Sequence, residues 1–462
     1  MDLQPFELLE FNHKKRLRQL YRMLRFPRLT RALHYLARPL YVDHETSFNK
    51  SFRYGLLSLG AGAMPAQELK ALRPGIKLIY ENFAEAQRAA ENDEPVLWTE
   101  WIINSEIARA FNVVPFCPEA LNLFGNVRGL EYPPLLIAEA ESQGTPVENC
   151  SAQKLVVGSW MLKQLPRPSV ILGATHPCDT SISVYQTLEY LTGAPTFVFD
   201  CPYFRSDEAL TYYEQNTWEM IRFLEKHLER KIDWDKLSEV LTRVNQTNEY
   251  LRSIVEMSRA IPCPSSMISL LFAWAAREID VGSPHLLEMA EGLYKVVKDR
   301  FDRGQGVVKK ERLRVIMWFP PMGFFTYLFK WMEDEFEAVC VADFIGYVST
   351  PHMDTSSEKS MVRCLANSQL QLAMGRQSNG PIEYFTGELE KLIDEYSPDC
   401  MIFSGHNGCK HGWASLRIVK DFCRKKELPS LYLDIDIMDC RHTSEQGIKD
   451  QVRAFFREHG WA

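Results

Sequence analysis

The pattern of hydrophobic and polar positions divides the chain into three parts. Over residues 1–92 the apolar residues recur at helical spacing, with no strong strand signal. From residue 93 short apolar runs alternate with helical segments until the polar segment 303–306, after which the alternation starts again. The pattern therefore predicts a helical N-terminal extension (1–92), a first α/β domain with long helices (93–302) and a second α/β domain (303–462).

Short apolar runs rich in Val, Ile and Phe mark the predicted strands. Because strands that alternate with helices imply parallel connections, each domain is predicted to contain a doubly wound parallel sheet. The predicted strands are 96–98, 113–116, 169–174 and 195–200 in the first domain, and 313–319, 338–343, 400–404 and 430–434 in the second. The predicted helices include 76–91, 105–111, 135–142, 152–165, 207–229, 234–260, 266–279 and 284–301.

Length and composition limit the class of protein. The chain has 462 residues, more than one ordinary core accommodates, and its 46% hydrophobic and 24% charged residues are typical of a soluble globular protein. A net charge of −7 gives no support to nucleic-acid binding. No apolar run is long enough to span a bilayer and no signal-peptide pattern is present, so we expect the eleven cysteines to be reduced thiols in a cytoplasm.

Positive charge is concentrated near the start of the sequence. Residues 11–42 contain no acidic side chain, and nine lysines and arginines alternate there with leucines and aromatic residues. Such a stretch can dock on an acidic partner or an anionic surface. Pro27 interrupts the pattern, which favours the alternative of a helix that packs on its own protein or on a sister subunit.

Three cysteines occupy positions where a predicted element ends. Cys150 lies between two predicted helices, Cys178 follows strand 169–174, and Cys409 follows strand 400–404. Open α/β sheets bind ligands at the carboxyl ends of their strands, so thiolates placed there can converge on a metal. Since Cys150 and Cys178 belong to the first domain and Cys409 to the second, the metal centre is predicted in the cleft between the domains.

The remaining cysteines and the metal itself leave alternatives open. Cysteine is most often a small buried hydrophobe, so most of the others are predicted to be structural. With His176 or His406 as a fourth ligand, the three chosen cysteines would form a closed structural zinc site of the Cys3His type. The predicted core cysteines are Cys263, Cys340, Cys364, Cys400 and Cys423, and the reserve ligands, at strand ends beside proline, are Cys117 and Cys201.

Three side chains are candidates for moving protons. His176 and His406 lie close in sequence to candidate ligands and are predicted to be catalytic, with the alternative that each orients a ligand through a hydrogen bond. Glu119 follows strand 113–116 and is also predicted to be catalytic, with the alternative of a carboxylate stabilised at a helix N-terminus. The sequence contains no phosphate-binding P-loop, so any ATP hydrolysis would belong to another protein.

Longer segments around two of the cysteines resemble the family of benzoyl-CoA reductase and 2-hydroxyacyl-CoA dehydratase catalytic subunits. The resemblance covers about residues 95–462 and rests on several segments together, because a single one such as Gly-Cys-Lys is uninformative. The segments are THPCD at 175–179, FDCPY at 199–203, HNGCK at 406–410, LPSLYLDID at 428–436 and RHTSEQ at 441–446.

This resemblance implies a [4Fe-4S] cluster held by Cys150, Cys178 and Cys409. It further implies a two-domain subunit that pairs with a related second catalytic subunit as a heterodimer, receives single electrons from an ATP-hydrolysing module and acts on an acyl-CoA thioester. Glu119, in its Pro-Glu pair, resembles a position near the active site of the family.

Within the family, the long N-terminal extension and the HNGCK segment are similar to the larger cluster-binding subunit of ATP-dependent benzoyl-CoA reductase. That similarity implies dearomatising reduction of benzoyl-CoA. The alternatives are an (R)-2-hydroxyacyl-CoA dehydratase subunit, in which the electron is recycled and water is lost, and a homodimeric reductase with a double-cubane cluster.

Overall fold

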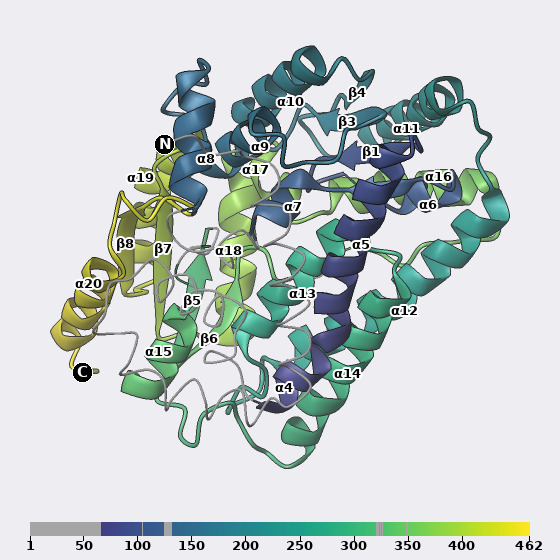
Figure 1. Ribbon diagram of the computed structural model, residues 1–462. Helices are drawn as coiled ribbons and strands as arrows, with labels where there is room; N and C mark the ends of the chain where they lie inside the picture. Colours follow the sequence, from purple (N-terminus) through teal and green to yellow (C-terminus); the bar gives the residue numbers. More distant parts are fainter. Residues whose placement is uncertain are drawn as a thin grey trace.

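The computed structural model describes residues 66–462 except 104, 124–131, 320–322, 324, 326 and 348–349. Two four-stranded parallel sheets with flanking helices make up this part of the chain (Figure 1). The predicted α/β class with two parallel sheets is therefore confirmed. The basic stretch at 11–42 lies outside the described residues.

The helices and strands fall into two halves, each built around one sheet. The first half contains α4 (Ala66–Ala71), α5 (Arg73–Glu91), β1 (Val96–Thr99), α6 (Glu106–Ala110), β2 (Val114–Phe116), α7 (Pro118–Leu123), α8 (Tyr132–Ser142), α9 (Ser151–Met161), β3 (Val170–Ala174), α10 (Asp179–Thr192), β4 (Thr196–Phe199), α11 (Asp207–Leu228), α12 (Trp234–Met257), α13 (Met267–Ile279) and α14 (Pro284–Asp302). The second half contains β5 (Leu313–Trp318), α15 (Leu328–Phe336), β6 (Ala338–Asp343), α16 (Glu358–Leu370), α17 (Gly375–Ser378), α18 (Ile382–Tyr396), β7 (Cys400–His406), α19 (Lys410–Lys425), β8 (Ser430–Ile435) and α20 (Glu445–Glu458).

Both sheets have the same strand order. The first is β2-β1-β3-β4 and the second is β6-β5-β7-β8, and all neighbouring strands are parallel. In each sheet the chain begins at an inner strand, β1 or β5, and adds its next strand on one side of it. The two strands that follow are then added on the opposite side. This reversal creates a topological switch point between β1 and β3 and another between β5 and β7, where open sheets bind ligands beyond their carboxyl ends.

Alternate residues of the first sheet enter two different apolar cores. Val96 and Trp98 of β1 pack in the smaller core, whereas Leu97 between them packs in the larger one. Successive side chains of a strand point to opposite faces, so both faces of this sheet are covered. The larger core also contains Val315 and Phe403 from the second sheet, and it therefore joins the two halves.

The described helices at the N-terminal side are attached to the first half. Helix α5 contacts β1, β2, α13 and α14, and α4 contacts α14. Helix α11 of the first half lies against α16 of the second, and the two helices are also seen beside one another in Figure 1. The division at residues 92 and 302 stays a prediction.

Most predicted elements are found close to their expected limits, and two differences have a clear cause. The predicted helix 152–165 ends at Met161 because Lys163 adopts the left-handed conformation, with φ of 54°. The predicted strand 400–404 continues as far as His406, since β8 pairs with it up to Ile435. The longer strand carries His406 to the edge of the sheet.

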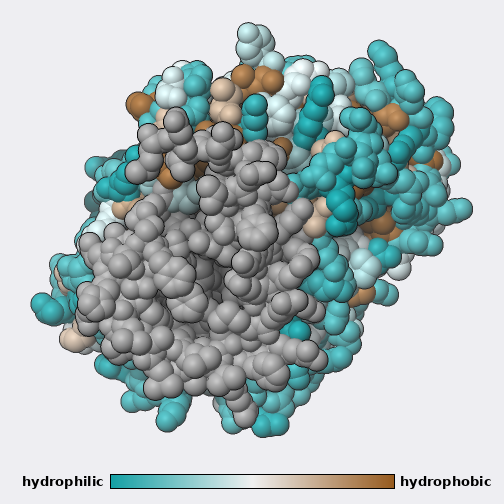
Figure 2. All heavy atoms as spheres, viewed as in Figure 1, coloured by the Kyte–Doolittle hydropathy of each residue, from teal (hydrophilic) through white to brown (hydrophobic). Residues whose placement is uncertain are grey.

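The hydropathy of the surface can be followed in Figure 2. On the face shown in Figure 2, the coloured residues are mostly hydrophilic, with separate hydrophobic patches among them. Among the described residues, no helix is both long and apolar enough to cross a membrane.

Candidate functional site

A pocket lies where the carboxyl ends of the two sheets meet. It encloses about 610 Å³, part of which is open to solvent. Its wall contains Cys150, Cys178 and Cys409, together with Trp101 beyond β1 and Phe319 beyond β5. The structure thus brings the three predicted ligands together, at the switch-point ends of both sheets.

Each of the three cysteines is the N-cap residue of a helix. Cys150 precedes α9, Cys178 precedes α10 and Cys409 precedes α19. The first N–H groups of a helix have no intrahelical partner and form the positive end of its dipole, which favours an anionic sulfur there. At Cys409 the Gly412 N–H donates to Sγ at 3.4 Å. Three helix N-termini therefore meet at one pocket.

Burial opposes the ionisation of these thiols. It raises the pKa of Cys178 to about 12 and the pKa of Cys409 to about 11, and it raises the pKa of Cys150 well above the ordinary value. For Cys150 the next largest causes are Cys178 and Cys409, because neighbouring thiolates repel one another. A cationic metal centre among them would remove this repulsion, so the donor set suits a thiophilic metal.

Gly408 allows the second half to approach Cys150. A β-carbon at position 408 would lie 2.9 Å from Cys150 Cα and 2.9 Å from the Asn149 carbonyl oxygen. Both are backbone atoms of the first half, so a side chain here would push the loops of Cys150 and Cys409 apart. The glycine before Cys409 therefore sets the spacing of two candidate ligands.

His406 contacts the first cysteine directly. Its Nε2 lies 3.2 Å from Cys150 Sγ, and its Nδ1 accepts a hydrogen bond from the Ile437 N–H at 3.4 Å. Burial lowers the pKa of His406, which favours the neutral ring, while the neighbouring Asp436 acts in the opposite direction. In the tautomer whose Nδ1 accepts from the Ile437 N–H, the proton is on Nε2, and the Nε2–H donates a hydrogen bond to the sulfur.

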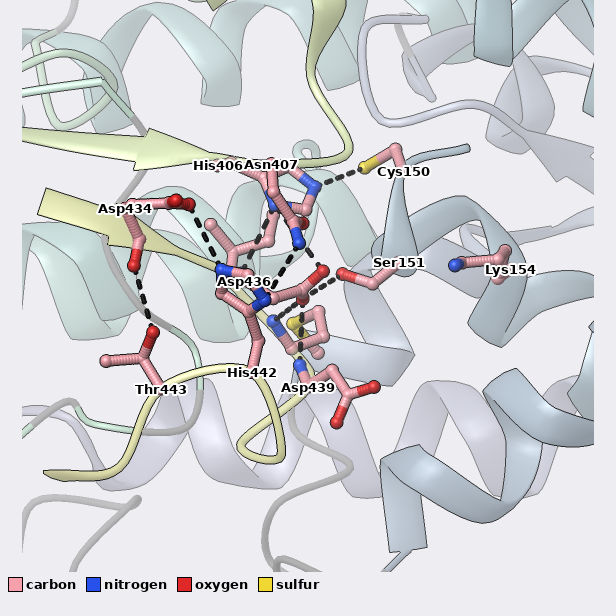
Figure 3. Close-up of polar contacts among 12 residues, drawn as sticks. Cys150, Ser151, Lys154, His406, Asn407, Asp434, Asp436, Asp439, His442 and Thr443 are labelled. Carbon is pink, nitrogen blue, oxygen red and sulfur yellow. Dashed lines mark hydrogen bonds and ion pairs between the residues drawn. The ribbon is translucent and has the colours of Figure 1, made fainter. Parts of the chain in front are cut away.

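Asp436, just beyond β8, holds the loop behind His406. It accepts hydrogen bonds from the Ser151 hydroxyl and from the backbone N–H groups of Met438 and Asp439, the latter two at 2.8 Å. In Figure 3 Ser151, Asp436 and His406 are turned toward one another. Since Ser151 directly follows Cys150, Asp436 joins the first-half cysteine to the second half. The sequence interpretation missed this residue, although it closes the LPSLYLDID segment and follows a strand.

Glu119 lies behind the pocket wall. The Tyr185 hydroxyl contacts both of its carboxylate oxygens at 2.9 Å, and Gln153 Nε2 donates to Oε1 at 3.0 Å. Burial raises the pKa of Glu119 to about 7, against the effect of these hydrogen bonds. Gln153 itself lines the pocket, so Glu119 reaches the pocket only through that amide in the described structure.

His176 also lies behind the wall. It is buried, and within the described residues neither of its ring nitrogens has a hydrogen-bond partner. Burial lowers the pKa of His176 to about 4. Gly375 of α17 faces the ring, since a β-carbon there would lie 3.0 Å from His176 Cδ2. Pro177, the next residue, lines the pocket. A catalytic role of His176 stays a prediction.

The sequence interpretation missed a second buried carboxyl, Glu100. It directly follows β1, and Glu119 similarly follows the adjacent strand β2, so the rule that ligands gather at strand ends could have identified it. The Ala174 N–H donates to Glu100 Oε2 at 3.0 Å, and the Ser181 hydroxyl contacts Oε1. Burial, followed by the charge of Glu119, raises the pKa of Glu100 well above the ordinary value.

An ion pair crosses the rim of the pocket. Lys410 Nζ lies 2.8 Å from Asp179 Oδ2, and the two side chains directly follow Cys409 and Cys178. Both side chains are 53% exposed, so solvent screens the pair and it adds little to stability. Its effect is to fasten the two halves next to the candidate ligands.

The other cysteines behave mostly as expected. Cys117 is buried against Glu119, and Cys201 Sγ accepts a hydrogen bond from Asn379. Among the residues that the structure describes, the pocket wall includes neither reserve ligand. The predicted core cysteines Cys263, Cys340, Cys400 and Cys423 are buried, whereas Cys364 is half-buried.

The donor set of three thiolates at one pocket suits a thiophilic metal centre. In the described part of the chain, no group of three or more His, Cys, Asp or Glu side chains is compact enough to hold one metal ion. A Cys3His zinc site needs all four ligands on one ion. In a cubane cluster each cysteine binds a different iron, so the thiolates can be spread around a pocket, as these three are.

The sequence is similar to known acyl-CoA enzymes. The family described as 2-hydroxyglutaryl-CoA dehydratase, D-component, matches residues 100–458, which include all three pocket cysteines. A benzoyl-CoA reductase subunit from Thauera aromatica is 21% identical over 405 residues, which cover 82% of this chain and 92% of that protein. The (R)-2-hydroxyisocaproyl-CoA dehydratase alpha subunit from Clostridioides difficile is 24% identical over 254 residues, or 52% of this chain and 61% of that protein.

Proposed function

The chain belongs to the 2-hydroxyglutaryl-CoA dehydratase, D-component family, and on this premise we propose that it is the iron–sulfur catalytic subunit of an ATP-dependent benzoyl-CoA reductase. Cys150, Cys178 and Cys409 would hold a [4Fe-4S] cluster. The observation that carries the proposal is the meeting of three N-cap cysteines, from both halves of the chain, in one pocket. Three protein thiolates leave one iron of such a cluster without a cysteine.

When bound, the cluster would supply single electrons of low potential to the thioester-activated ring. The chain itself would orient the substrate and exclude water through Trp101, Phe319 and Phe344 in the pocket wall. His406 would donate a hydrogen bond from Nε2 to the Cys150 sulfur and so adjust the reduction potential of the cluster. Glu119, with a pKa of about 7, would hold a proton close to the pocket.

His176 is the third proposed proton carrier. Its ring nitrogens have no hydrogen-bond partner among the described residues, and the next residue, Pro177, belongs to the pocket wall. The alternative, that His176 only fills the space beside Gly375, predicts no change in turnover when the ring is replaced by one of similar shape.

Two partners follow from this function. The relatives from Thauera aromatica and Clostridioides difficile are both named as subunits, which supports a related second catalytic subunit. Since this sequence has no P-loop, an ATP-hydrolysing module would deliver the electrons. The substrate would be an acyl-CoA thioester.

A second candidate function is that of an (R)-2-hydroxyacyl-CoA dehydratase subunit. It is supported by the 24% identity to the Clostridioides difficile alpha subunit. The reductase is preferred because the similarity to the Thauera aromatica protein extends over 82% of this chain and 92% of that relative, compared with 52% and 61% for the dehydratase.

The cluster is tested by purifying the full chain without oxygen and measuring iron, acid-labile sulfide and zinc. We expect a brown protein that contains iron and sulfide and loses its colour in air. Stoichiometric zinc without iron and sulfide would overturn the proposal.

The reaction is tested with the activating module, ATP and a reductant, offering benzoyl-CoA and a 2-hydroxyacyl-CoA separately. The reductase predicts a product of benzoyl-CoA that has gained hydrogen. Loss of water from the 2-hydroxyacyl-CoA, with benzoyl-CoA unchanged, would select the dehydratase instead.

A further inference from the structure

Two buried carboxyls lie side by side beyond the first sheet without a cation. Glu100 is 0% exposed and Glu119 is 1% exposed, and they follow the paired strands β1 and β2. Within the described ranges neither forms an ion pair with a lysine, arginine or histidine. Burial of this kind disfavours the carboxylate form and raises the pKa of both groups.

A hydrogen-bonded chain joins these carboxyls. Gln153 Nε2 donates both to Glu119 Oε1 at 3.0 Å and to Ser181 Oγ at 3.2 Å. The Ser181 hydroxyl in turn contacts Glu100 Oε1. The order is therefore Glu119, Gln153, Ser181, Glu100, and every link is a direct contact between side chains.

The middle of this chain belongs to the pocket wall, although Ser181 is 0% and Gln153 2% exposed. Gln153 and Ser181 both line the pocket, whereas the carboxyls themselves do not. Ser181 lies on the first turn of α10, which begins directly after Cys178. A hydroxyl that touches a protonated carboxyl on one side and the pocket on the other can pass a proton between them, which an amide such as Gln153 does poorly.

We propose that Glu100, acting through the Ser181 hydroxyl, is a proton reservoir for the substrate bound in the pocket. The inference rests on the proposed function and names the source of a proton that ring reduction consumes. The substrate anion, formed with an electron from the ATP-hydrolysing partner, takes the hydroxyl proton of Ser181. The carboxyl proton of Glu100 moves to Ser181 Oγ, and Glu100 is left as a carboxylate.

Contact with the relay decides which carboxyl exchanges its proton, since Glu100 touches the Ser181 hydroxyl whereas Glu119 is reached through the Gln153 amide. Tyr185 and Cys117 touch Glu119, and Glu278 of α13 adds a further acidic group near it, while Cys178 is close to Glu100. Once Glu100 has become a carboxylate, its charge makes ionisation of Glu119 less favourable. Glu100 is therefore the carboxyl that exchanges its proton through Ser181.

The first test detects the proton on the Glu100 carboxyl by infrared spectroscopy. Infrared spectra of the full chain near neutral pH should contain a protonated-carboxyl band that disappears in Glu100→Gln and shifts in Ser181→Ala, which removes its hydrogen-bond partner. The control is Glu333→Gln, since Glu333 on α15 is a buried carboxyl with a pKa raised to about 8 by burial but is paired with Lys330. The Glu333 band should not respond to Ser181→Ala. If Glu100→Gln removes no such band, the reservoir is wrong.

The second test measures whether turnover depends on the Glu100 proton. Glu100→Gln and Ser181→Ala should each lower turnover of the proposed substrate by about 10²-fold, the double variant should be no worse than either, and both should alter the pH profile while iron content stays the same. Turnover and pH profile equal to those of Glu333→Gln would overturn the proposal. If the unmodified protein converts neither thioester, the proposed function fails, and the infrared result alone then decides whether Glu100 supplies a proton through Ser181.

Discussion

His406 Nε2 lies 3.2 Å from Cys150 Sγ, and this contact joins the edge of the second sheet to a cysteine of the first half, 256 positions away in the sequence. A hydrogen bond to a cluster sulfur stabilises the more negative, reduced state and so raises the reduction potential. The contact therefore connects the spacing of the two halves to the redox chemistry proposed for the pocket.

Replacing His406 by phenylalanine should leave the iron content unchanged. It should shift the reduction potential of the cluster to a more negative value, because the hydrogen bond to the Cys150 sulfur is lost. The potential would be measured by a dye-mediated titration followed by electron paramagnetic resonance. His442→Phe is the matched control, since His442 bonds Asn407 and Asp434 near the surface (Figure 3) and, among the described residues, is not part of the pocket wall. Equal potentials in the two variants would contradict the role given to His406.

Removing a pocket cysteine should remove the cluster. Cys409→Ala is expected to lose iron and sulfide, and so are the alanine variants of Cys150 and Cys178, because each thiolate would hold a separate iron. Cys423→Ala, which removes a buried thiol beside Met401, should keep the metal. Comparable iron in Cys409→Ala and Cys423→Ala would mean that the ligands are wrongly assigned.

Gly408→Ala should separate the two halves at the site. The added β-carbon would meet backbone atoms of Asn149 and Cys150 at 2.9 Å, so we expect a loss of about 1–3 kcal/mol in stability and weaker cluster binding. Gly387→Ala is the control, because Gly387 lies inside α18 with no other atom within 4 Å of the new carbon, and alanine there should stabilise the helix by up to about 1 kcal/mol. The free energy of unfolding would be measured in urea for both variants. A decrease in Gly408→Ala with an increase in Gly387→Ala would support the role of Gly408, and equal changes would refute it.

Glu119 should make stability depend on pH in a definite direction. Burial raises its pKa in the folded protein to about 7 from 4.5, so the folded state holds the proton more tightly than the unfolded state. The resulting stabilisation is complete below pH 4.5 and is lost as the pH rises through 7, a change on the order of 3 kcal/mol. Glu119→Gln should therefore flatten the fall in unfolding free energy between acidic and alkaline pH, compared with the exposed Glu458→Gln. Parallel pH curves for all three proteins would show that Glu119 is not buried as described.

Much of the site followed from local signals. Cys178 and Cys409 could be chosen because each comes shortly after an apolar strand, and Cys150 because it separates two helical patterns. Asp436 and Glu100 have the same signal, since each ends a strand, but a carboxylate at a strand end is common and says nothing about its neighbours. Glu119 and His176 were predicted to be catalytic; the structure places both behind the wall, and their roles stay predictions.

The sequence by itself determined two parallel α/β units and the three cysteines at element ends, because the period of apolar residues is a local property that fixes strands, helices and the ends where side chains emerge. Only the tertiary structure decided that three helix N-termini share one pocket, that His406 reaches Cys150, and that Glu100 is buried beside Ser181. These contacts depend on how the two sheets dock, and docking is governed by the shape of the shared core and by close approaches such as Gly408 against Cys150, which no pattern along the chain records.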